Sequence, residues 1–354
     1  MKILIFLAHP AHFHLFKNVI YNLKYNGHTI KVLIKSKDLL EELVDEANME
    51  YSNILVEGRS NSLLGMGWAM IKKDWRIFLH CINFKPSLLI GTPPELGHIG
   101  TILKIPYINV REDDATINRR LFNYINYPWA NHILTPISCY NAQWENKSIK
   151  YHGYHELAYL HPNHFKPNKE IVKSYLTTDT PYFLLRFVKL TAHHDQGIKG
   201  ISNSLALKII NILSTRGRVL ISSEREIDKD LEKYRISVKP SDIHHLLAYA
   251  TLYIGDSQTM AAEAAVLGTP FIRFNDFAGR IGYLNELEYE YKLGYSFKTN
   301  ESEKLLKKII DLLSMPNLKR KFTDRKKIML DEKIDVALFL TRFIENYPDL
   351  LLKK

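Results

Sequence analysis

The chain has 354 residues, of which 46% are apolar and 24% are charged. This composition is typical of a packed soluble protein and unlike that of a disordered, collagenous or disulfide-stapled chain. Because a domain usually holds roughly 100 to 200 residues, the length predicts two globular halves. Only Cys81 and Cys139 are present, too few for a disulfide framework or a zinc cluster, so we expect a reducing, cytoplasmic environment.

Charge and hydropathy limit the partners. The first apolar run, residues 3–8, is shorter than the apolar region of a signal peptide, and no stretch reaches the roughly 18 apolar residues of a membrane span. Contact with the inner face of a membrane would therefore be peripheral.

A net charge of +10 makes nucleic acid, anionic lipid and phosphorylated substrates candidate partners. Much of that charge lies between Lys304 and Lys327, which we interpret as a solvated helix face, and no RNP, KH or helix-turn-helix signature indicates nucleic acid.

The N-terminal half alternates between short apolar runs and amphipathic stretches. Residues 2–8 predict a buried parallel strand, residues 13–26 a helix that ends at Gly27, and residues 28–34 the next strand. Further strands are predicted at residues 87–91, 107–110 and 132–135. This alternation predicts a parallel sheet with helices on both faces.

Residues 62–83 are rich in apolar side chains on an otherwise basic stretch. They include Leu63, Leu64, Met66, Trp68, Met70, Trp75, Ile77, Phe78 and Leu79. Core packing is the favoured interpretation. The alternative is a partly exposed apolar patch that rests on a membrane surface or accepts a lipid-linked substrate.

The periodicity lapses over residues 151–167 into His, Tyr, Pro and Asn, as is typical of a connection between domains. The second half then repeats the alternation, with strands predicted at 182–186, 218–221, 251–254 and 270–273 and helices at 201–214, 258–267 and 303–313. We therefore predict an N-terminal Rossmann-like domain over 1–150, a linker over 151–167, a second Rossmann-like domain over 168–330, and a C-terminal helix over 331–354 that packs back on the first domain. Two doubly wound sheets would place their strand ends across a shared crevice, where ligands bind.

The most informative segment spans residues 251–270. A short apolar strand ends at Gly255, and an Ala-rich helix then runs until Gly268. The unpaired amides and dipole at such a helix N-terminus favour an anion such as a diphosphate, and Ser257 and Thr259 can add hydroxyl donors. Glu263 falls about one turn inside the helix, where its carboxylate can accept two hydrogen bonds from a ribose diol. The alternative for Glu263 is an exposed helix residue.

These residues carry a family resemblance. Residues 255–270 resemble the nucleotide-binding region of GT-B glycosyltransferases and of the non-hydrolysing UDP-N-acetylglucosamine 2-epimerases, in which a glutamate at the place of Glu263 binds ribose. The segments YHGYHELAYLHP at 151–162 and PAHFH at 10–14 resemble signatures of domain-of-unknown-function family three-five-four, a GT-B-like group. The resemblance runs from the first strand to about Tyr295 and implies the GT-B fold, an α/β architecture of two Rossmann-like domains facing a central crevice. At residues 256–258 the chain departs from the smaller, Gly-rich turn of its relatives.

Histidines follow the first predicted strand at positions 9, 12 and 14. A loop there is where GT-B enzymes present groups to the acceptor, and a histidine could take a proton from an attacking hydroxyl. His12 is the expected base, and His14, in the first turn of the helix, is the second choice because it could serve only to cap or pack. No carboxylate or cysteine completes a metal site within this motif, so no metal is expected.

Carboxylates follow the strand at 107–110, in the run Arg111, Glu112, Asp113 and Asp114. Clustered carboxylates raise one another's pKa and could do acid/base work. The epimerases use carboxylates in a similar place, which implies roles for Glu112 and Asp113 under that alternative. The other interpretation is a charged loop with helix-capping Asp residues.

Arg186 ends the first strand of the second half, followed by His193 and His194. Its guanidinium could bind a diphosphate in place of a metal, whereas the alternative is a surface ion pair. Residues 197–200 are too short for a Walker loop, and no GxGxxG fingerprint is present.

The leading hypothesis is therefore glycosyl transfer from a nucleotide sugar, UDP-linked, to a hydroxyl of a saccharide or lipid-linked acceptor, without a metal or other cofactor. In it His12 deprotonates the acceptor, and the leaving nucleotide is held by Arg186, Gly255, Ser257, Gln258, Thr259, Met260 and Glu263. The runner-up is a sugar-nucleotide 2-epimerase that uses Glu112, Asp113 and a histidine in proton transfer. A third possibility is a non-enzymatic GT-B-like half of a complex.

Overall fold

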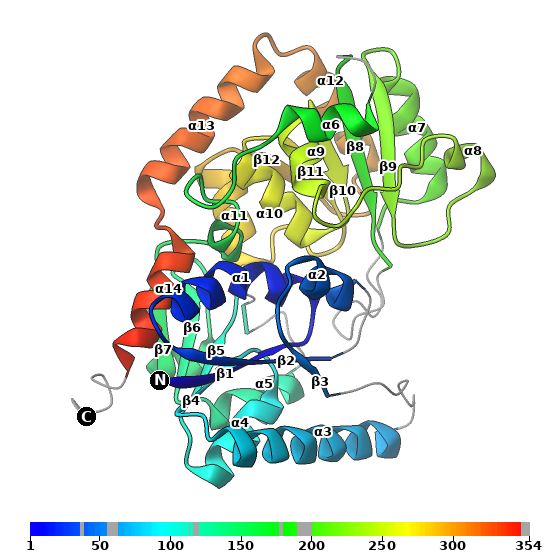
Figure 1. Ribbon diagram of the computed structural model, residues 1–354. Coiled ribbons are helices and arrows are strands. Elements are labelled where there is room, and N and C mark those ends of the chain that lie inside the picture. The colour runs from blue at the N-terminus through cyan, green and yellow to red at the C-terminus, as the bar shows by residue number, and fades with distance from the viewer. Residues whose placement is uncertain are drawn as a thin grey trace. The chain divides into compact units, whose positions relative to one another are not determined.

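A computed structural model describes residues 1–35, 39–54, 63–112, 114–115, 120–176, 180–189 and 200–347, with the backbone alone for 63–67 and 120–122. It divides into two compact units (Figure 1). Unit 1 comprises Met1–Tyr159 and Ile334–Lys354, and unit 2 comprises Leu160–Lys333. The chain passes from unit 1 to unit 2 between Tyr159 and Leu160, inside the range expected for the connection, and returns after Lys333.

Unit 1 is built on a seven-stranded parallel sheet in the order β3-β2-β1-β4-β5-β6-β7. The strands are β1 (Lys2–Leu7), β2 (Thr29–Ile34), β3 (Ser52–Asn53), β4 (Leu88–Gly91), β5 (Tyr107–Val110), β6 (His132–Pro136) and β7 (Ser148–Tyr151). The order reverses at β1, so right-handed crossovers place helices on both faces. The continuous apolar runs of the central strands follow from this double cover, because both of their faces are buried.

The helices of unit 1 cover its sheet in two layers (Figure 1). They are α1 (Pro10–Tyr25), α2 (Leu40–Glu46), α3 (Leu63–Phe84), α4 (Pro94–Leu103), α5 (Arg120–Asn126) and α14 (Val336–Glu345), with short turns η1 (Tyr127–Trp129), η2 (Ala142–Lys147) and η3 (His155–Ala158). The helix α14, from the end of the chain, packs against α1 and η3. Polar contacts reinforce this packing: Asn26 Nδ2 donates to Glu345 Oε1 at 2.7 Å, and Ile334 N donates to His152 O at 2.8 Å.

Unit 2 has a five-stranded parallel sheet in the order β12-β11-β10-β8-β9. Its strands are β8 (Tyr182–Phe187), β9 (Arg218–Ser223), β10 (Leu252–Gly255), β11 (Phe271–Phe274) and β12 (Gly294–Phe297). Its helices are α6 (Lys169–Tyr175), α7 (Asn203–Leu213), α8 (Lys229–Glu232), α9 (Ile243–Tyr249), α10 (Gln258–Leu267), α11 (Gly282–Asn285), the π-helix η4 (Glu286–Glu290), α12 (Ser302–Leu313) and α13 (Leu318–Glu332). The predicted α/β class with two doubly wound parallel sheets is confirmed.

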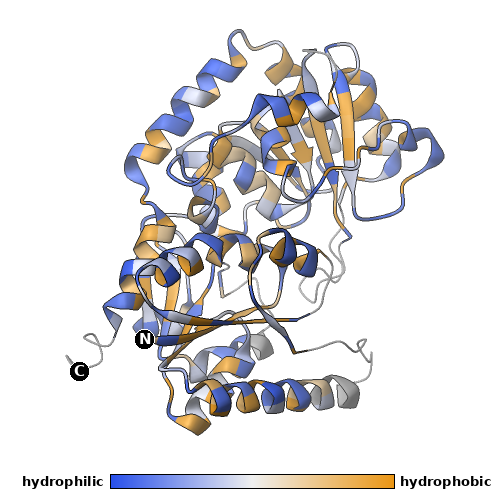
Figure 2. Cartoon of the chain, in the orientation of Figure 1, coloured by the Kyte–Doolittle hydropathy of each residue, from blue (hydrophilic) through white to orange (hydrophobic). Residues whose placement is uncertain are grey.

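The helix α3 departs from the interpretation favoured by the sequence. Ile77 is buried, but Trp68 and Trp75 are 61% and 60% exposed, and Leu79 is exposed as well. Core packing is therefore the wrong interpretation for these three side chains, because the helix buries only one stripe against α4 and the sheet. Apolar and polar residues alternate along α3 in Figure 2. In the described part of the chain, no helix is both long and apolar enough to cross a membrane.

A charged pair joins α3 to α4. Asp74 Oδ2 lies 3.2 Å from His98 Nδ1, while His98 Nε2 lies 3.3 Å from the carbonyl oxygen of Ile125. The hydrogen bond with Asp74 is the main cause that raises the pKa of His98 above its ordinary value. Because two acceptors face the ring, the doubly protonated imidazolium satisfies both.

We predict that replacing His98 by Gln destabilises unit 1 in a pH-dependent way. A folded-state pKa raised above that of the unfolded chain contributes stability that is complete below the unfolded value and is lost as the pH rises through the folded value. The difference in unfolding free energy between wild type and H98Q should be about 1 to 2 kcal/mol at about pH 6 and smaller at about pH 9. Urea unfolding at the two pH values measures it, and an equal difference at both would contradict a charged His98.

Candidate functional site

The carboxyl ends of four strands of unit 2 lie in register. Gly255 at the end of β10 is paired with Arg186 of β8 on one side and with Arg273 of β11 on the other, and Arg186 is paired in turn with Ser222 of β9. Ligands of open α/β sheets bind at this edge. The register therefore brings together two of the predicted residues, Arg186 and Gly255, and adds Arg273, which the sequence analysis did not single out.

The turn after Gly255 starts α10. Ser257 is the N-cap, and its Oγ accepts a hydrogen bond from Met260 N at 3.2 Å. Among the described residues, the backbone N–H groups of Ser257, Gln258 and Thr259 have no hydrogen-bond partner. Three such amides in succession at a helix N-terminus, with the dipole behind them, are an arrangement that favours an anion. The side chain of Thr259 is partly exposed beside them, whereas that of Met260 is buried.

A buried polar network holds Gln258. Arg273 is fully buried and contacts Glu288, with its Nη2 at 2.9 Å from Glu288 Oε1. Its Nη1 donates to Gln258 Oε1 at 2.5 Å, and Ser296 Oγ donates to Glu288 Oε2. Burying an ion pair is costly unless each charge is also hydrogen-bonded, as both are here. With the Gln258 carbonyl group held in this way, its amide nitrogen remains as a donor at the start of α10.

Asp256 explains the departure from a Gly-rich turn. Its Oδ1 accepts a hydrogen bond from Val188 N at 2.8 Å, and a Cβ on Gly200 would lie 2.4 Å from its Oδ2. The carboxylate therefore contacts both flanks of residues 190–199. Burial is the main cause that raises the pKa of Asp256 to about 6. Asp256 therefore links Val188, which follows β8, to Gly200.

Glu263 lies on the buried face of α10. It is 7% exposed, so the alternative of an exposed helix glutamate is wrong. Its Oε1 lies 3.0 Å from Nε2 of His244 on α9. A carboxylate among the alanines of this helix needs such a partner, because an uncompensated buried charge is strongly unfavourable.

Arg186 is held by its neighbours on β9. Its Nη1 donates to Ser222 Oγ at 2.7 Å, and its Nη2 forms an ion pair with Glu224. These two contacts hold the guanidinium at the strand ends, next to Gly255. It is partly exposed there. His193 and His194 lie outside the described residues.

His12 lies at the carboxyl end of the unit 1 sheet, in the first turn of α1. Its Nδ1 accepts a hydrogen bond from Ala8 N at 3.1 Å, and its Nε2 lies 3.0 Å from Thr92 Oγ1. A neutral ring in this arrangement carries its proton on Nε2. His14, by contrast, stacks on Tyr159 with ring centroids 5.0 Å apart, which is a packing contact.

Glu112 follows β5 and contacts the segment 151–162. Its Oε1 accepts a hydrogen bond from His155 N at 2.6 Å, and its Oε2 lies 3.6 Å from His155 Nδ1. Burial and the positive charge of Arg111 lower the pKa of His155 to about 3, so this imidazole is neutral next to the carboxylate. Within the described residues its Nε2 has no hydrogen-bond partner. Asp113 lies outside the described residues.

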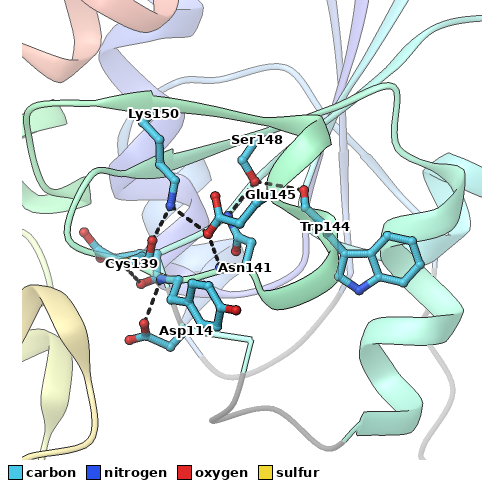
Figure 3. Close-up of polar contacts among 9 residues, drawn as sticks. Asp114, Cys139, Asn141, Trp144, Glu145, Ser148 and Lys150 are labelled. Carbon is cyan, nitrogen blue, oxygen red and sulfur yellow. Dashed lines mark hydrogen bonds and ion pairs between the residues drawn. The ribbon is translucent and has the colours of Figure 1, made fainter.

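The loop that carries Glu112 is fixed by the β6–β7 connection (Figure 3). Cys139 Sγ donates to Glu112 O, and Tyr140 N donates to Asp114 Oδ1 at 2.8 Å. Lys150 contacts both Cys139 O and Glu145, so the connection is itself cross-linked. Asp114 thus accepts a backbone hydrogen bond from the β6–β7 connection.

No group of three or more His, Cys, Asp or Glu residues suited to a metal ion occurs in the described ranges. Independence from metal stays a prediction.

We predict that Asp256→Asn changes the pH dependence of stability. Because the folded-state pKa is raised, the stability that protonated Asp256 contributes is complete below the unfolded pKa and is lost as the pH rises to about 6. Between about pH 7.5 and about pH 5, wild type should gain roughly 1 kcal/mol of unfolding free energy relative to D256N. Denaturant titrations of both proteins at the two pH values test this, and parallel pH profiles would show that Asp256 titrates normally.

Comparisons with known proteins agree with this architecture. The structure of UDP-GlcNAc 2-epimerase from Neisseria meningitidis bound to UDP-GlcNAc superposes with a TM-score of 0.70 at 14% identity, over 100% of both chains. The S. aureus MnaA–UDP co-structure gives 0.71 at 10% identity, over 99% of this chain and 97% of that one. The spinosyn rhamnosyltransferase SpnG, complexed with spinosyn aglycone, gives 0.62 at 13% identity, over 98% and 100%. No curated protein matches the chain in sequence. These structures show the GT-B fold, and because a family model matches residues 1–337, the chain belongs to the family described as protein of unknown function DUF354.

Proposed function

We propose that this protein is a GT-B-type glycosyltransferase that moves a sugar from a UDP-linked donor to a saccharide or lipid-linked acceptor in surface polysaccharide or glycoconjugate synthesis. The observation that carries the proposal is the start of α10. Among the described residues, the backbone amides of residues 257–259 have no hydrogen-bond partner, and the buried carboxylate of Glu263 follows within the same helix. The first feature suits a diphosphate and the second suits a ribose.

Unit 2 would hold the donor. As the bond to the sugar breaks, negative charge develops on the departing diphosphate, and fixed N–H groups and a guanidinium stabilise that charge without rearrangement. Arg186 and Gln258 already have fixed positions next to Gly255. UDP is the proposed nucleotide because two of the similar structures contain UDP-GlcNAc or UDP.

Unit 1 would supply the base. His12 follows β1, where an acceptor-facing group is expected, and Thr92 contacts its ring. The lone pair of Nδ1 is engaged by Ala8 N–H, so the imidazole has to release this contact before it takes a proton. A bound acceptor hydroxyl would provide the replacement partner.

A cytoplasmic location with peripheral contact to the inner face of the membrane belongs to this proposal, because a lipid-linked acceptor would be presented there. Neither a nucleic acid partner nor a metal is part of it.

The second candidate is a sugar-nucleotide 2-epimerase. The observation that favours it is the carboxylate of Glu112 beside the neutral imidazole of His155, whose Nε2 has no partner within the described ranges. A neutral imidazole and a carboxylate held side by side could exchange protons with a substrate. Asp113 would be the additional carboxylate of this alternative.

We predict that Glu263→Gln weakens donor binding. A ligand at about a hundred times its Kd stabilises a protein by about 2.7 kcal/mol, so a screen of nucleotide sugars by thermal shift should identify the donor. Loss of the ribose contact in E263Q should reduce that shift, while Glu303→Gln, an exposed glutamate on α12, should leave it unchanged. Equal shifts in both variants would remove Glu263 from the nucleotide site.

We also predict that His12→Ala lowers the transfer rate by about 10² to 10⁴ fold, as expected for loss of a general base, without changing the affinity for UDP. His9→Ala, at the exposed N-cap position of the same helix, is the control. Transfer that proceeds at the wild-type rate in H12A would assign the base to another residue.

NMR of the pure protein with UDP-N-acetylglucosamine separates the two candidates. The proposed transferase leaves the sugar unchanged when no acceptor is added. Conversion to the manno epimer, lost in Glu112→Gln, would replace transfer by epimerisation as the function.

A further inference from the structure

The helix α3 presents an apolar stripe to solvent that the proposed activity does not use. Trp68, Ile71 and Trp75 are 61%, 56% and 60% exposed, and Leu79 and Ile82 continue the stripe with about half of each side chain exposed. These positions recur every three or four residues, so they share one face of the helix. Trp75 also stacks on Phe78, with ring centroids 5.6 Å apart, which keeps its indole in place on that face.

Taken together, α3, α4 and the residues directly after the two helices include more basic than acidic side chains. Between them, α3 and α4 contain two acidic residues, and both are engaged: Asp74 with His98 and Glu95 with Lys73. The cations Lys72 and Arg76 line a recess of about 300 Å³ together with Trp68, Ile71 and Trp75. Lys85 and Lys104, directly after α3 and α4, are exposed.

We propose that the stripe on α3, Trp68, Ile71, Trp75, Leu79 and Ile82, docks unit 1 on a bilayer that contains anionic lipids. Indole rings are favoured at the boundary between headgroups and acyl chains, and the aliphatic side chains beside them can enter the acyl region. Lysine and arginine next to such a face attract anionic headgroups. With no helix in the described ranges suited to cross the membrane, the contact is peripheral.

A second copy of the chain fits the stripe less well. In a two-fold pairing of α3 centred on Trp75, Lys72 and Arg76 would approach their own equivalents. Asp74, the one acidic residue in the sequence of α3, is engaged by His98, so a pairing of two α3 helices brings together more basic than acidic side chains. An anionic lipid surface would attract Lys72 and Arg76, whereas a second copy of α3 would repel them.

The proposal rests on the proposed function in that it assigns a surface to its peripheral membrane contact. The two can fail separately, because binding to vesicles requires neither donor nor acceptor. The test is co-flotation of the full chain with vesicles of phosphatidylcholine alone or mixed with phosphatidylglycerol. We expect binding to the anionic vesicles only, weakened by salt. The double variant Trp68→Ser, Trp75→Ser should bind about tenfold or more weakly, and Lys85→Glu with Lys104→Glu should lower binding by roughly fivefold or more.

Matched controls come from the last turn of α1 in the same unit. Tyr25→Ser and Lys24→Glu change an exposed aromatic and an exposed cation away from α3, so both should bind as wild type does. The variant Trp129→Phe, Trp144→Phe retains tryptophan only on α3. Its fluorescence should shift to shorter wavelength on anionic vesicles and be quenched by brominated lipids.

Three results would overturn the proposal. The first is no binding to anionic vesicles by wild type. The second is binding that is unchanged by the α3 variants but lost on Lys321→Glu, which would assign the contact to the basic face of α13. The third is a concentration-dependent dimer that Trp75→Ser abolishes, which would assign the stripe to a second copy.

Discussion

The backbone of unit 2 has no room for a side chain at residue 255. A Cβ on Gly255 would lie 2.4 Å from the hydroxyl oxygen of Tyr253 and 2.9 Å from the carbonyl oxygen of Arg186. Glycine at this position lets β10 end flush with β8 and β11 and lets the chain turn at once into α10. The amides at the start of α10 and the buried Glu263 take their positions from that turn.

Buried charge surrounds the turn. Arg273 with Glu288 and Glu263 with His244 are buried pairs, and the buried Asp256 accepts a hydrogen bond from the amide of Val188. A hydrophobic core of the same volume would cost less to fold, because desolvating charges offsets much of their mutual attraction. These buried charged side chains lie next to one edge of the sheet. Such an arrangement suits a site for a charged ligand, because side chains that are fixed in advance lose little entropy when the ligand binds. In unit 1 the loop of Glu112 is fixed in a similar way, by Cys139 and by the amide of Tyr140.

The sequence predicts this architecture well wherever local signals and burial agree. The segment from β10 to β11 is an example: Ser257 caps α10, Gly268 ends it in a left-handed conformation, and the predicted helix has the bounds that are observed. The strands β3, β7 and β12 were not predicted, because they are largely half-buried and none shows the continuous apolar run of a central strand. Trp68 and Trp75 were assigned to the core because hydrophobicity alone does not tell which face of a helix has a neighbour.

The residues of the candidate site show the same difference between local signals and contacts that are distant in sequence. Gly255 and the start of α10 were predicted because strand, turn and helix are adjacent in sequence. Arg273 and His155 were not, since their roles depend on contacts with Gln258, Glu288 and Glu112 that lie 15 to 43 residues away along the chain. Two signals could have indicated them: Arg273 ends a buried strand as Arg186 does, and His155 lies inside the family motif at 151–162.

A crystal structure with bound uridine diphosphate tests the central claim most directly. The account predicts a diphosphate in contact with the amides of Ser257, Gln258 and Thr259, and ribose hydroxyls within hydrogen-bond distance of the Glu263 carboxylate. Electron density for the nucleotide at another place, or none at a saturating concentration, would contradict it.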